Sequence, residues 1–166
     1  MNGKLVYLDT SSLLKRYIEE KGSEVVDKVY EESEAGNIKT AFSVWNIGEA
    51  LGVLDRYHRR ELITAEELET SIKGLISESI KMIKLDSLQL LPITSTSLID
   101  SWLVVLKHHI YEADALQISS SKESCCDLFL GADKRLIQVA IKEKVNAINI
   151  ELDPLKALDQ LSGTGE

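Results

Sequence analysis

The sequence predicts one α/β domain, with a central parallel sheet of about five short strands flanked by helices on both sides. Short apolar runs alternate with longer segments of helical periodicity, which is typical of a parallel sheet covered on both faces. The length of 166 residues suits a single domain, and 44% hydrophobic with 28% charged residues is an ordinary globular composition. These three observations together predict the class.

Each predicted strand is a short apolar run that stops at polar or turn-forming residues. The first contains Val6 and Tyr7 and stops at Asp9. The other runs follow the same pattern, separated by helical segments. In chain order, strands are expected at 4–8, 38–42, 88–93, 128–130 and 147–150.

The predicted helices begin at residues whose side chains can cap them. Hydroxyls at 10–12 start the first helix, Ser43 caps a long one, and Thr64 with Glu67 has the spacing of a capping box. In chain order, helices are expected at 12–19, 24–34, 44–59, 64–84, 94–107, 113–121 and 133–143.

The domain is expected to span residues 1–154, because Asp153 and Pro154 end the alternating pattern. Residues 155–166 then form a C-terminal tail that we expect to be weakly ordered. Two prolines, nine glycines and no internal repeat leave no segment that resembles a linker.

The charge balance limits the kinds of partner. The chain has 27 acidic and 19 basic residues, for a net charge of −8. This balance argues against binding duplex nucleic acid through broad basic surfaces, since such binding depends on Lys and Arg meeting phosphates. It leaves open a nucleic-acid enzyme whose acids hold metal ions.

Membrane and secreted classes are also disfavoured. No apolar run is long enough to cross a bilayer, and the acid at position 9 interrupts any secretory leader. The cysteines Cys125 and Cys126 are adjacent, so they cannot form an ordinary disulfide or, alone, a zinc site. We expect them to pack in the core of a cytoplasmic protein.

Four acids stand out from those on ordinary solvated helix faces. Asp9 and Asp133 each follow a predicted strand, although each also fits a plain helix N-cap. Glu49 interrupts the apolar run 44–54, where a lone carboxylate needs a charge partner, a metal or an exit to water. Asp114 lies in the first turn of its helix, where the helix dipole alone favours an acid.

The expected topology brings at least two, and up to four, of these acids to one edge of the sheet. Ligands of parallel sheets bind at the carboxyl ends of the strands. Clustered carboxylates raise one another's pKa unless cations intervene. Ligand sets made only of oxygen suit Mg²⁺ or Mn²⁺ rather than zinc. The natural chemistry of such a cluster is metal-assisted phosphoryl transfer.

The same four acids stand in segments that resemble PIN-domain ribonucleases, especially VapC-type toxins of toxin–antitoxin pairs. The resemblance extends from about residue 4 to residue 154. It depends on four segments in order: 8–17 (LDTSSLLKRY), 43–51 (SVWNIGEAL), 112–116 (EADAL) and 129–136 (FLGADKRL). Two positions depart from the family pattern: Gly131 stands where Thr or Ser is frequent, and Gln117 where His is frequent.

The resemblance implies a Mg²⁺- or Mn²⁺-dependent endoribonuclease that leaves 5′-phosphate and 3′-hydroxyl ends. Asp9, Glu49, Asp114 and Asp133 would be the catalytic, metal-holding residues, supported by Ser11. The histidines at 58, 108 and 109 are expected at helix ends without a catalytic role. The residues expected to contact RNA are basic: Lys15, Arg16, Arg56, Arg59, Lys134 and Arg135.

A VapC-like toxin would form a homodimer and bind a small antitoxin whose peptide covers the acidic cleft. Apolar residues at 13–29 are candidates for those contacts or for the protein's own core. An alternative is a non-catalytic PIN-type module that binds RNA or protein. A haloacid-dehalogenase-type phosphatase would need Asp-x-Asp after the first strand, where this chain has Asp9-Thr10-Ser11.

Overall fold

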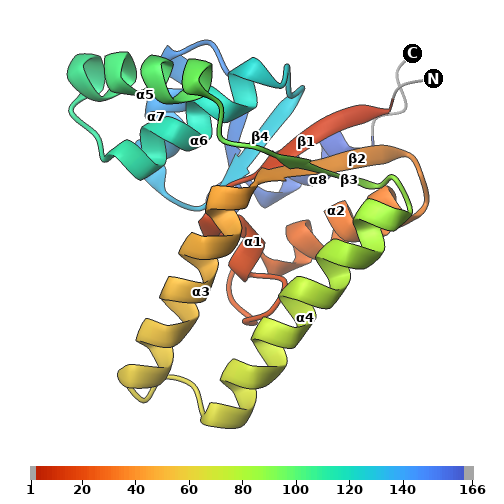
Figure 1. Cartoon of the computed structure of the whole chain (residues 1–166). Coiled ribbons are helices and arrows are strands. Elements are labelled where there is room, and N and C mark those ends of the chain that lie inside the picture. Colours follow the sequence, from red (N-terminus) through yellow and green to blue (C-terminus); the bar gives the residue numbers. More distant parts are fainter. Residues whose placement is uncertain (1–2, 163–166) are drawn as a thin grey trace.

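Five parallel strands form the central sheet of the computed structural model, which describes residues 3–162 (Figure 1). Their order across the sheet is β3-β2-β1-β4-β5. All four neighbouring pairs are parallel, which confirms the predicted fold class. The strands are β1 (Lys4–Leu8), β2 (Ile38–Ser43), β3 (Leu88–Leu91), β4 (Leu128–Gly131) and β5 (Ala147–Asn149).

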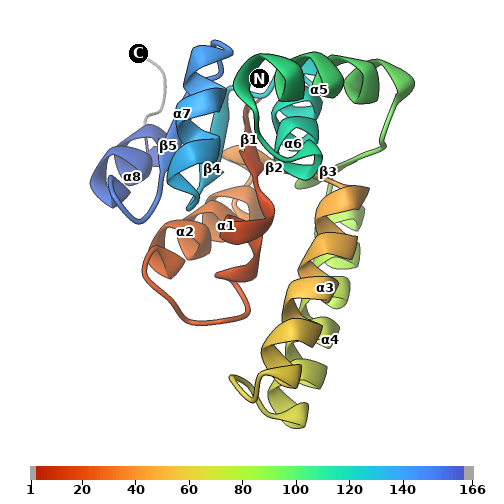
Figure 2. The same cartoon turned by 90° about the vertical axis from the view of Figure 1, so that its left-hand side faces the viewer.

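Helices cover both faces of this sheet, and two buried clusters of apolar side chains fill the space between them (Figures 1 and 2). Val6 and Leu8 of β1 face one layer and Tyr7 faces the other, because side chains alternate along a strand. The first layer contains α1 (Thr10–Leu14), α2 (Ser23–Glu34), α3 (Val44–Arg59), α4 (Ala65–Lys84) and α8 (Pro154–Ser162). The second contains α5 (Ser95–His108), α6 (Glu112–Glu123) and α7 (Lys134–Lys142).

The strand order creates a switch point between β1 and β4. From β1 the chain proceeds outward through β2 and β3, then returns to the other side of β1 with β4 and β5. Crevices of open α/β sheets lie at such a point, outside the carboxyl ends of the strands. Asp9 and Asp133 come directly after these two strands or within two residues of them.

Helix α1 is shorter than the predicted 12–19. It begins at Thr10, because the Asp9 side chain caps it by accepting a hydrogen bond from Ser12 N at 2.7 Å. Beyond Leu14 the chain turns away, and the carbonyl of Lys15 accepts a bond from the Ser23 hydroxyl at 2.8 Å. The other elements agree with their predicted ranges to within a few residues.

The prediction of a weakly ordered tail from residue 155 is wrong for the part that the structure describes. Pro154–Ser162 form α8, which buries Ala157 and Leu161 beside α2. A proline fits the first position of a helix, where its missing N–H is not needed, so Pro154 starts an element instead of ending one. Residues 163–166 of the predicted tail lie outside the described residues.

One smaller expectation is corrected and another is confirmed. Cys125 is exposed at a φ of 53°, and only Cys126 packs partly against the core, where burial raises the pKa of its thiol to about 12. Most apolar residues at 13–29 belong to the protein's own core.

Within residues 3–162, no helix combines the length and apolar character needed to cross a bilayer.

The burial pattern of α8 predicts unequal effects of two leucine substitutions. Leu161 is 4% exposed and Leu155 is 75% exposed on the same helix. Leu161→Ala is expected to lower the free energy of unfolding by about 2 kcal/mol or more through the cavity it leaves. The matched Leu155→Ala should change it by less than about 0.5 kcal/mol. Denaturant unfolding checks this, and equal effects would contradict a docked α8.

Candidate active site

A cleft of about 330 Å³ opens at the carboxyl ends of β1 and β4 and contains all four predicted acids. Asp9 follows β1, Asp133 follows β4, Glu49 comes from α3 and Asp114 from the first turn of α6. Residues more than 120 positions apart in sequence therefore line one cavity. The sequence argument expected two to four carboxylates at one sheet edge, and all four lie there.

Asp9 is held in place by the start of α1. Its carboxylate is 1% exposed and accepts hydrogen bonds from Ser12 N and from the Ser11 hydroxyl, both at 2.7 Å. Burial nevertheless raises the pKa of Asp9 to about 6, with the nearby Asp114 contributing and the Ser11 and Ser12 hydrogen bonds opposing. Asp9 is therefore a buried acid, and among residues 3–162 no Lys, Arg or His forms an ion pair with it.

Glu49 is positioned by a buried amide network. The Thr10 hydroxyl donates to its Oε2, and Gln117 Nε2 donates to the same oxygen at 3.3 Å. Gln117 Oε1 in turn accepts from Thr10 N at 3.0 Å and from Asn46 Nδ2 at 2.7 Å. These hydrogen bonds join three segments of the chain, which follow β1, β2 and α5.

Asp114 and Asp133 both line the cleft. Burial raises the pKa of Asp114 to about 6, followed by the charges of Asp133 and Glu49, while Arg135 opposes the rise. Asp133 is exposed and caps α7 by accepting from Leu136 N at 2.7 Å. Both N-cap interpretations of the strand-end acids are thus correct, and neither excludes a place in the site.

Gly131 is explained by the position of Asp9. A Cβ at residue 131 would lie 2.8 Å from Asp9 Oδ2, so the buried carboxylate occupies the space that a side chain would need. The hydroxyl that the family frequently has at this position is absent here. Ser11 instead contacts both oxygens of Asp9 and accepts from Ala132 N at 2.9 Å, linking α1 to the end of β4.

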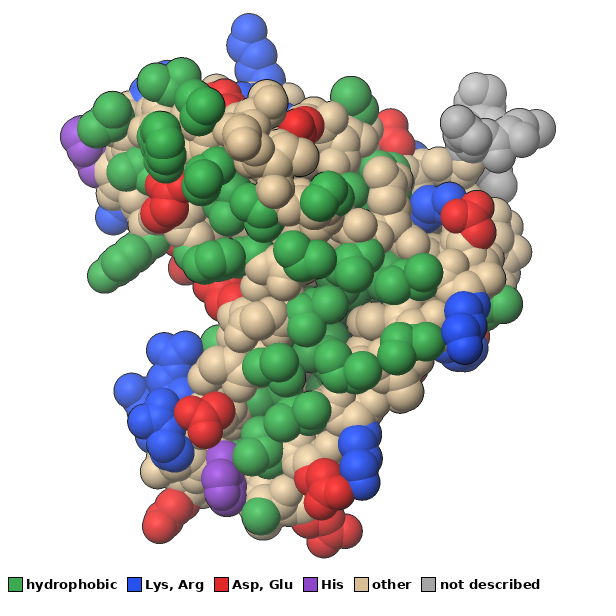
Figure 3. All heavy atoms as spheres, viewed as in Figure 1, with side chains coloured by type: hydrophobic (Ala, Val, Ile, Leu, Met, Phe, Trp, Pro, Cys, Tyr) green, Lys and Arg blue, Asp and Glu red, His purple; other side chains and the backbone are tan. Residues whose placement is uncertain are grey.

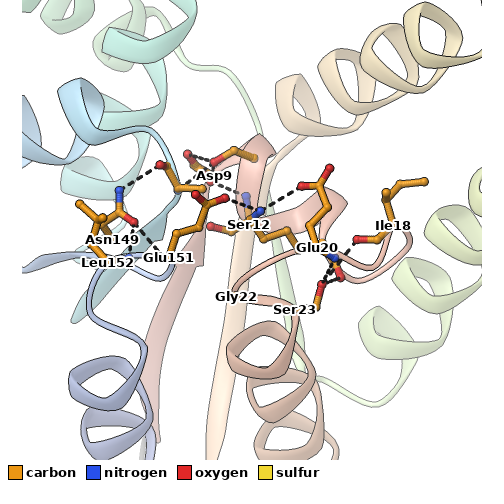
Figure 4. A network of polar contacts seen from close by, with 12 residues as sticks. Asp9, Ser12, Ile18, Glu20, Gly22, Ser23, Asn149, Glu151 and Leu152 are labelled. Atoms are coloured by element: carbon orange, nitrogen blue, oxygen red, sulfur yellow. Dashed lines mark hydrogen bonds and ion pairs between the residues drawn. The ribbon is translucent and has the colours of Figure 1, made fainter. Parts of the chain in front are cut away.

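Two of the predicted RNA-contact residues are already paired with acids. Lys15 lines the cleft but is buried between Glu20 at 3.0 Å and Glu151 at 2.6 Å, two acids that Figure 4 labels in its polar network. Burial alone would lower the pKa of Lys15, but the bonds to Glu151 and Glu20 outweigh it and the pKa is raised. Arg16 pairs with Asp27 at 2.6 Å and Glu78 at 2.8 Å.

The other four basic residues are exposed. Arg56 and Arg59 lie in the last turn of α3, where Arg59 pairs with Asp55. Lys134 and Arg135 open α7 beside Asp133, and Arg135 lines a cavity next to the acids. The three histidines are in the last turns or at the ends of α3 and α5, as expected.

The acids fit a hydrated divalent cation better than a closed metal site. Among residues 3–162, no three His, Cys, Asp or Glu side chains are grouped closely enough to hold an ion together. Hard divalent ions such as Mg²⁺ keep several waters and use one or two protein carboxylates. Burial, followed by the charges of neighbouring carboxylates, raises the pKa values of Asp9 and Asp114, and a bound cation would favour their charged forms.

The sequence matches a known family over most of its length. Residues 6–142 match the family described as PIN domain. The chain belongs to the PIN-domain family. The PIN domain is a nuclease-type fold, and its acids in this chain lie in one cleft at the sheet's switch point.

A solved structure supports the fold assignment of this PIN domain. The protein PAE2754 from Pyrobaculum aerophilum matches with a TM-score of 0.65 and 18% sequence identity. The match covers 95% of this chain and 91% of that chain. At this identity the likeness concerns the fold alone. No curated protein is significantly similar in sequence.

Sequence reasoning missed Asn46 and the hub role of Gln117. Asn46 is fully buried and joins Tyr7, Ser43, Thr10 and Gln117 in one network. In the sequence, Asn46 is an amide three residues before Glu49 in an apolar segment. A side chain of this kind requires buried hydrogen-bond partners. From the sequence, Gln117 stands out only as a departure from the family pattern.

The raised pKa of Asp9 predicts a pH-dependent effect on stability. Between pH 3.8 and about 6 the folded state binds more protons at Asp9 than the unfolded state does, so stability falls as pH rises through this window. At about 1.4 kcal/mol for each pKa unit, Asp9→Asn should gain up to about 3 kcal/mol over the wild type at pH 7.5 without divalent ions.

Denaturant unfolding at several pH values measures this gain, which should vanish near pH 4. Asp159→Asn, on an exposed position of α8, is the control and should show no such window. A gain independent of pH would contradict the assigned cause.

The close approach of Asp9 to Gly131 predicts that even one methyl group there is harmful. Gly131→Ala should lower the free energy of unfolding by about 1–3 kcal/mol through overpacking. Gly48→Ala is the matched control, because nothing lies within 4 Å of its Cβ position in α3. That change should raise stability by about 0.5–1 kcal/mol. Thermal or denaturant unfolding compares them, and a neutral Gly131→Ala would show that Asp9 can move.

Proposed function

We propose that this PIN domain is a divalent-metal-dependent endoribonuclease that hydrolyses RNA phosphodiester bonds. The observation that carries the proposal is the convergence of Asp9, Glu49, Asp114 and Asp133 on one cleft at the switch point of the sheet. Most buried carboxylates in proteins pair with cations. Here Asp9 is buried and Asp114 is partly buried in a cleft that they share with two further acids, where a metal ion would supply the missing positive charge.

The four acids would hold Mg²⁺ or Mn²⁺ directly or through water. When bound, such an ion activates water and stabilises the charge that develops on the scissile phosphate. Ser11 and the backbone of Ser12 orient Asp9, and Thr10 with Gln117 orients Glu49. Because these supports are buried hydrogen bonds on helices and strands, the carboxylates are held before any ligand arrives.

Substitution of the acids tests the proposal. With Mn²⁺, purified protein should cut RNA and leave 5′-phosphate ends. Asp9→Asn, Glu49→Gln, Asp114→Asn and Asp133→Asn should each reduce the rate on the order of 100-fold or more, since each removes several kcal/mol of charge stabilisation. Glu66→Gln, in the exposed first turn of α4, should leave the rate unchanged.

The same assay tests the second candidate function, that of a non-catalytic RNA-binding or protein-interaction module. The lack of a ready three-residue metal site among residues 3–162 favours it. If wild type and Asp9→Asn are equally inert on diverse RNAs, the result supports the non-catalytic module and rejects the enzyme.

We further propose that the enzyme is the toxin of a VapBC-type pair and acts in the cytoplasm as a homodimer. Its antitoxin peptide would cover the acidic cleft. Exposed apolar side chains on α4 and α5 include Ile80, Trp102 and Leu106 and support protein contacts. Figure 3 shows many hydrophobic side chains on the face of the molecule that it presents. The expected gene arrangement is a short reading frame directly upstream that encodes a DNA-binding antitoxin.

A further inference from the structure

A second cavity adjoins the acidic cleft and shares two of its acids. It has a volume of about 460 Å³, within the usual range of ligand pockets. Its lining residues are His109, Ile110, Tyr111, Asp114, Asp133 and Arg135. A polymer chain held at the acids can therefore continue into this cavity without leaving the protein surface.

Tyr111 presents an aromatic ring at the mouth of this cavity from a fixed backbone. Its side chain is 85% exposed, and it occupies the N-cap position of α6 without making a side-chain cap. On one side, Ile110 is buried in the core and His109 N bonds Val105 O at 2.8 Å. On the other, the Tyr111 carbonyl accepts from Ala115 N at 3.0 Å. The ring is exposed although the backbone that carries it is ordered.

Arg135 supplies a positive charge to the same cavity. One of its nitrogens, Nη2, donates to the carbonyl of His109 at 2.7 Å, which orients the guanidinium. Over residues 3–162, no carboxylate lies within 4.0 Å to pair with it, in contrast to Lys15 and Arg16. Its other N–H groups are available to a phosphate, for which the guanidinium geometry is well suited.

We propose that Tyr111 and Arg135 form a nucleotide subsite beside the acids, in which a base of the RNA stacks on the Tyr111 ring and a neighbouring phosphate accepts hydrogen bonds from Arg135. This subsite rests on the proposed ribonuclease function. Unstacked bases of single-stranded RNA bind aromatic faces in this way, with little dependence on sequence. An apolar anchor of a protein partner fits less well, because it would bury two carboxylates and a guanidinium.

Binding measurements with matched RNAs test the subsite. Fluorescence anisotropy with labelled uridine hexamers, in Ca²⁺ and with strand integrity checked on gels, gives the Kd of wild type and variants. A hexamer with the same ribose–phosphate backbone and no bases is the matched probe. Tyr111→Ala should weaken binding of the uridine hexamer about tenfold and leave the abasic one unchanged.

Control variants separate the ring from the rest of the site. Tyr111→Phe keeps the aromatic face and should bind as wild type. Arg135→Gln should weaken both hexamers, because it removes a phosphate contact. Leu155→Ala, at an exposed position of α8 outside this cavity, should change neither Kd.

Four results would overturn the subsite: an unchanged Kd in Tyr111→Ala, an equal loss for both hexamers, a wild type that binds neither hexamer, or a changed oligomeric state on size-exclusion chromatography, which would assign the ring to a protein contact. Cleavage of RNA is tested separately from binding. Base-dependent binding through Tyr111 without cleavage would keep the subsite and reject the enzyme. Cleavage together with a Kd that does not depend on Tyr111 would keep the enzyme and reject the subsite.

Discussion

The buried carboxylate of Asp9 is the constraint on which the rest of the site depends. It ends β1, the central strand, and Asp9 N extends the ladder by bonding Leu130 O at 3.0 Å. A charge in this position must be solvated by the protein, and Ser11 and Ser12 do so at the start of α1. Because Ser11 also accepts from Ala132 N, the same bonds fix the end of β4, from which Asp133 and α7 begin.

The buried amides extend this order to Glu49 and to α6, the helix that carries Asp114. Gln117 Oε1 accepts two hydrogen bonds while its Nε2 donates a third. An amide oxygen has two lone pairs, whereas a neutral imidazole nitrogen has one, so a histidine at 117 could not replace all three bonds. Gln117 and the buried Asn46 thus form a matched pair, and the departure from the family pattern at 117 is explained by its partner on α3.

The sequence was sufficient for the sheet, most helices and the four acids, because these follow from local patterns and from the rule that strand ends meet at one edge. It was insufficient where partners are distant along the chain. Lys15 and Arg16 looked free, yet Glu151 and Glu78 pair with them in the folded protein. The helix α8 was missed because Pro154 was interpreted as a stop, although only the packing of Ala157 and Leu161 distinguishes a stop from a first helical residue.

These pairings change how a protein with a net charge of −8 can attract RNA. The first two cations after Asp9 in the sequence, Lys15 and Arg16, are paired with acids, so the cleft itself repels a phosphate. Under the proposed function, attraction would come from a divalent ion at the carboxylates and from the exposed Lys134 and Arg135 at the rim. An ion held by the acids would reverse the sign of the local field that an RNA phosphate meets. Since few phosphates are contacted by protein cations, the affinity should depend only weakly on monovalent salt and strongly on the divalent ion.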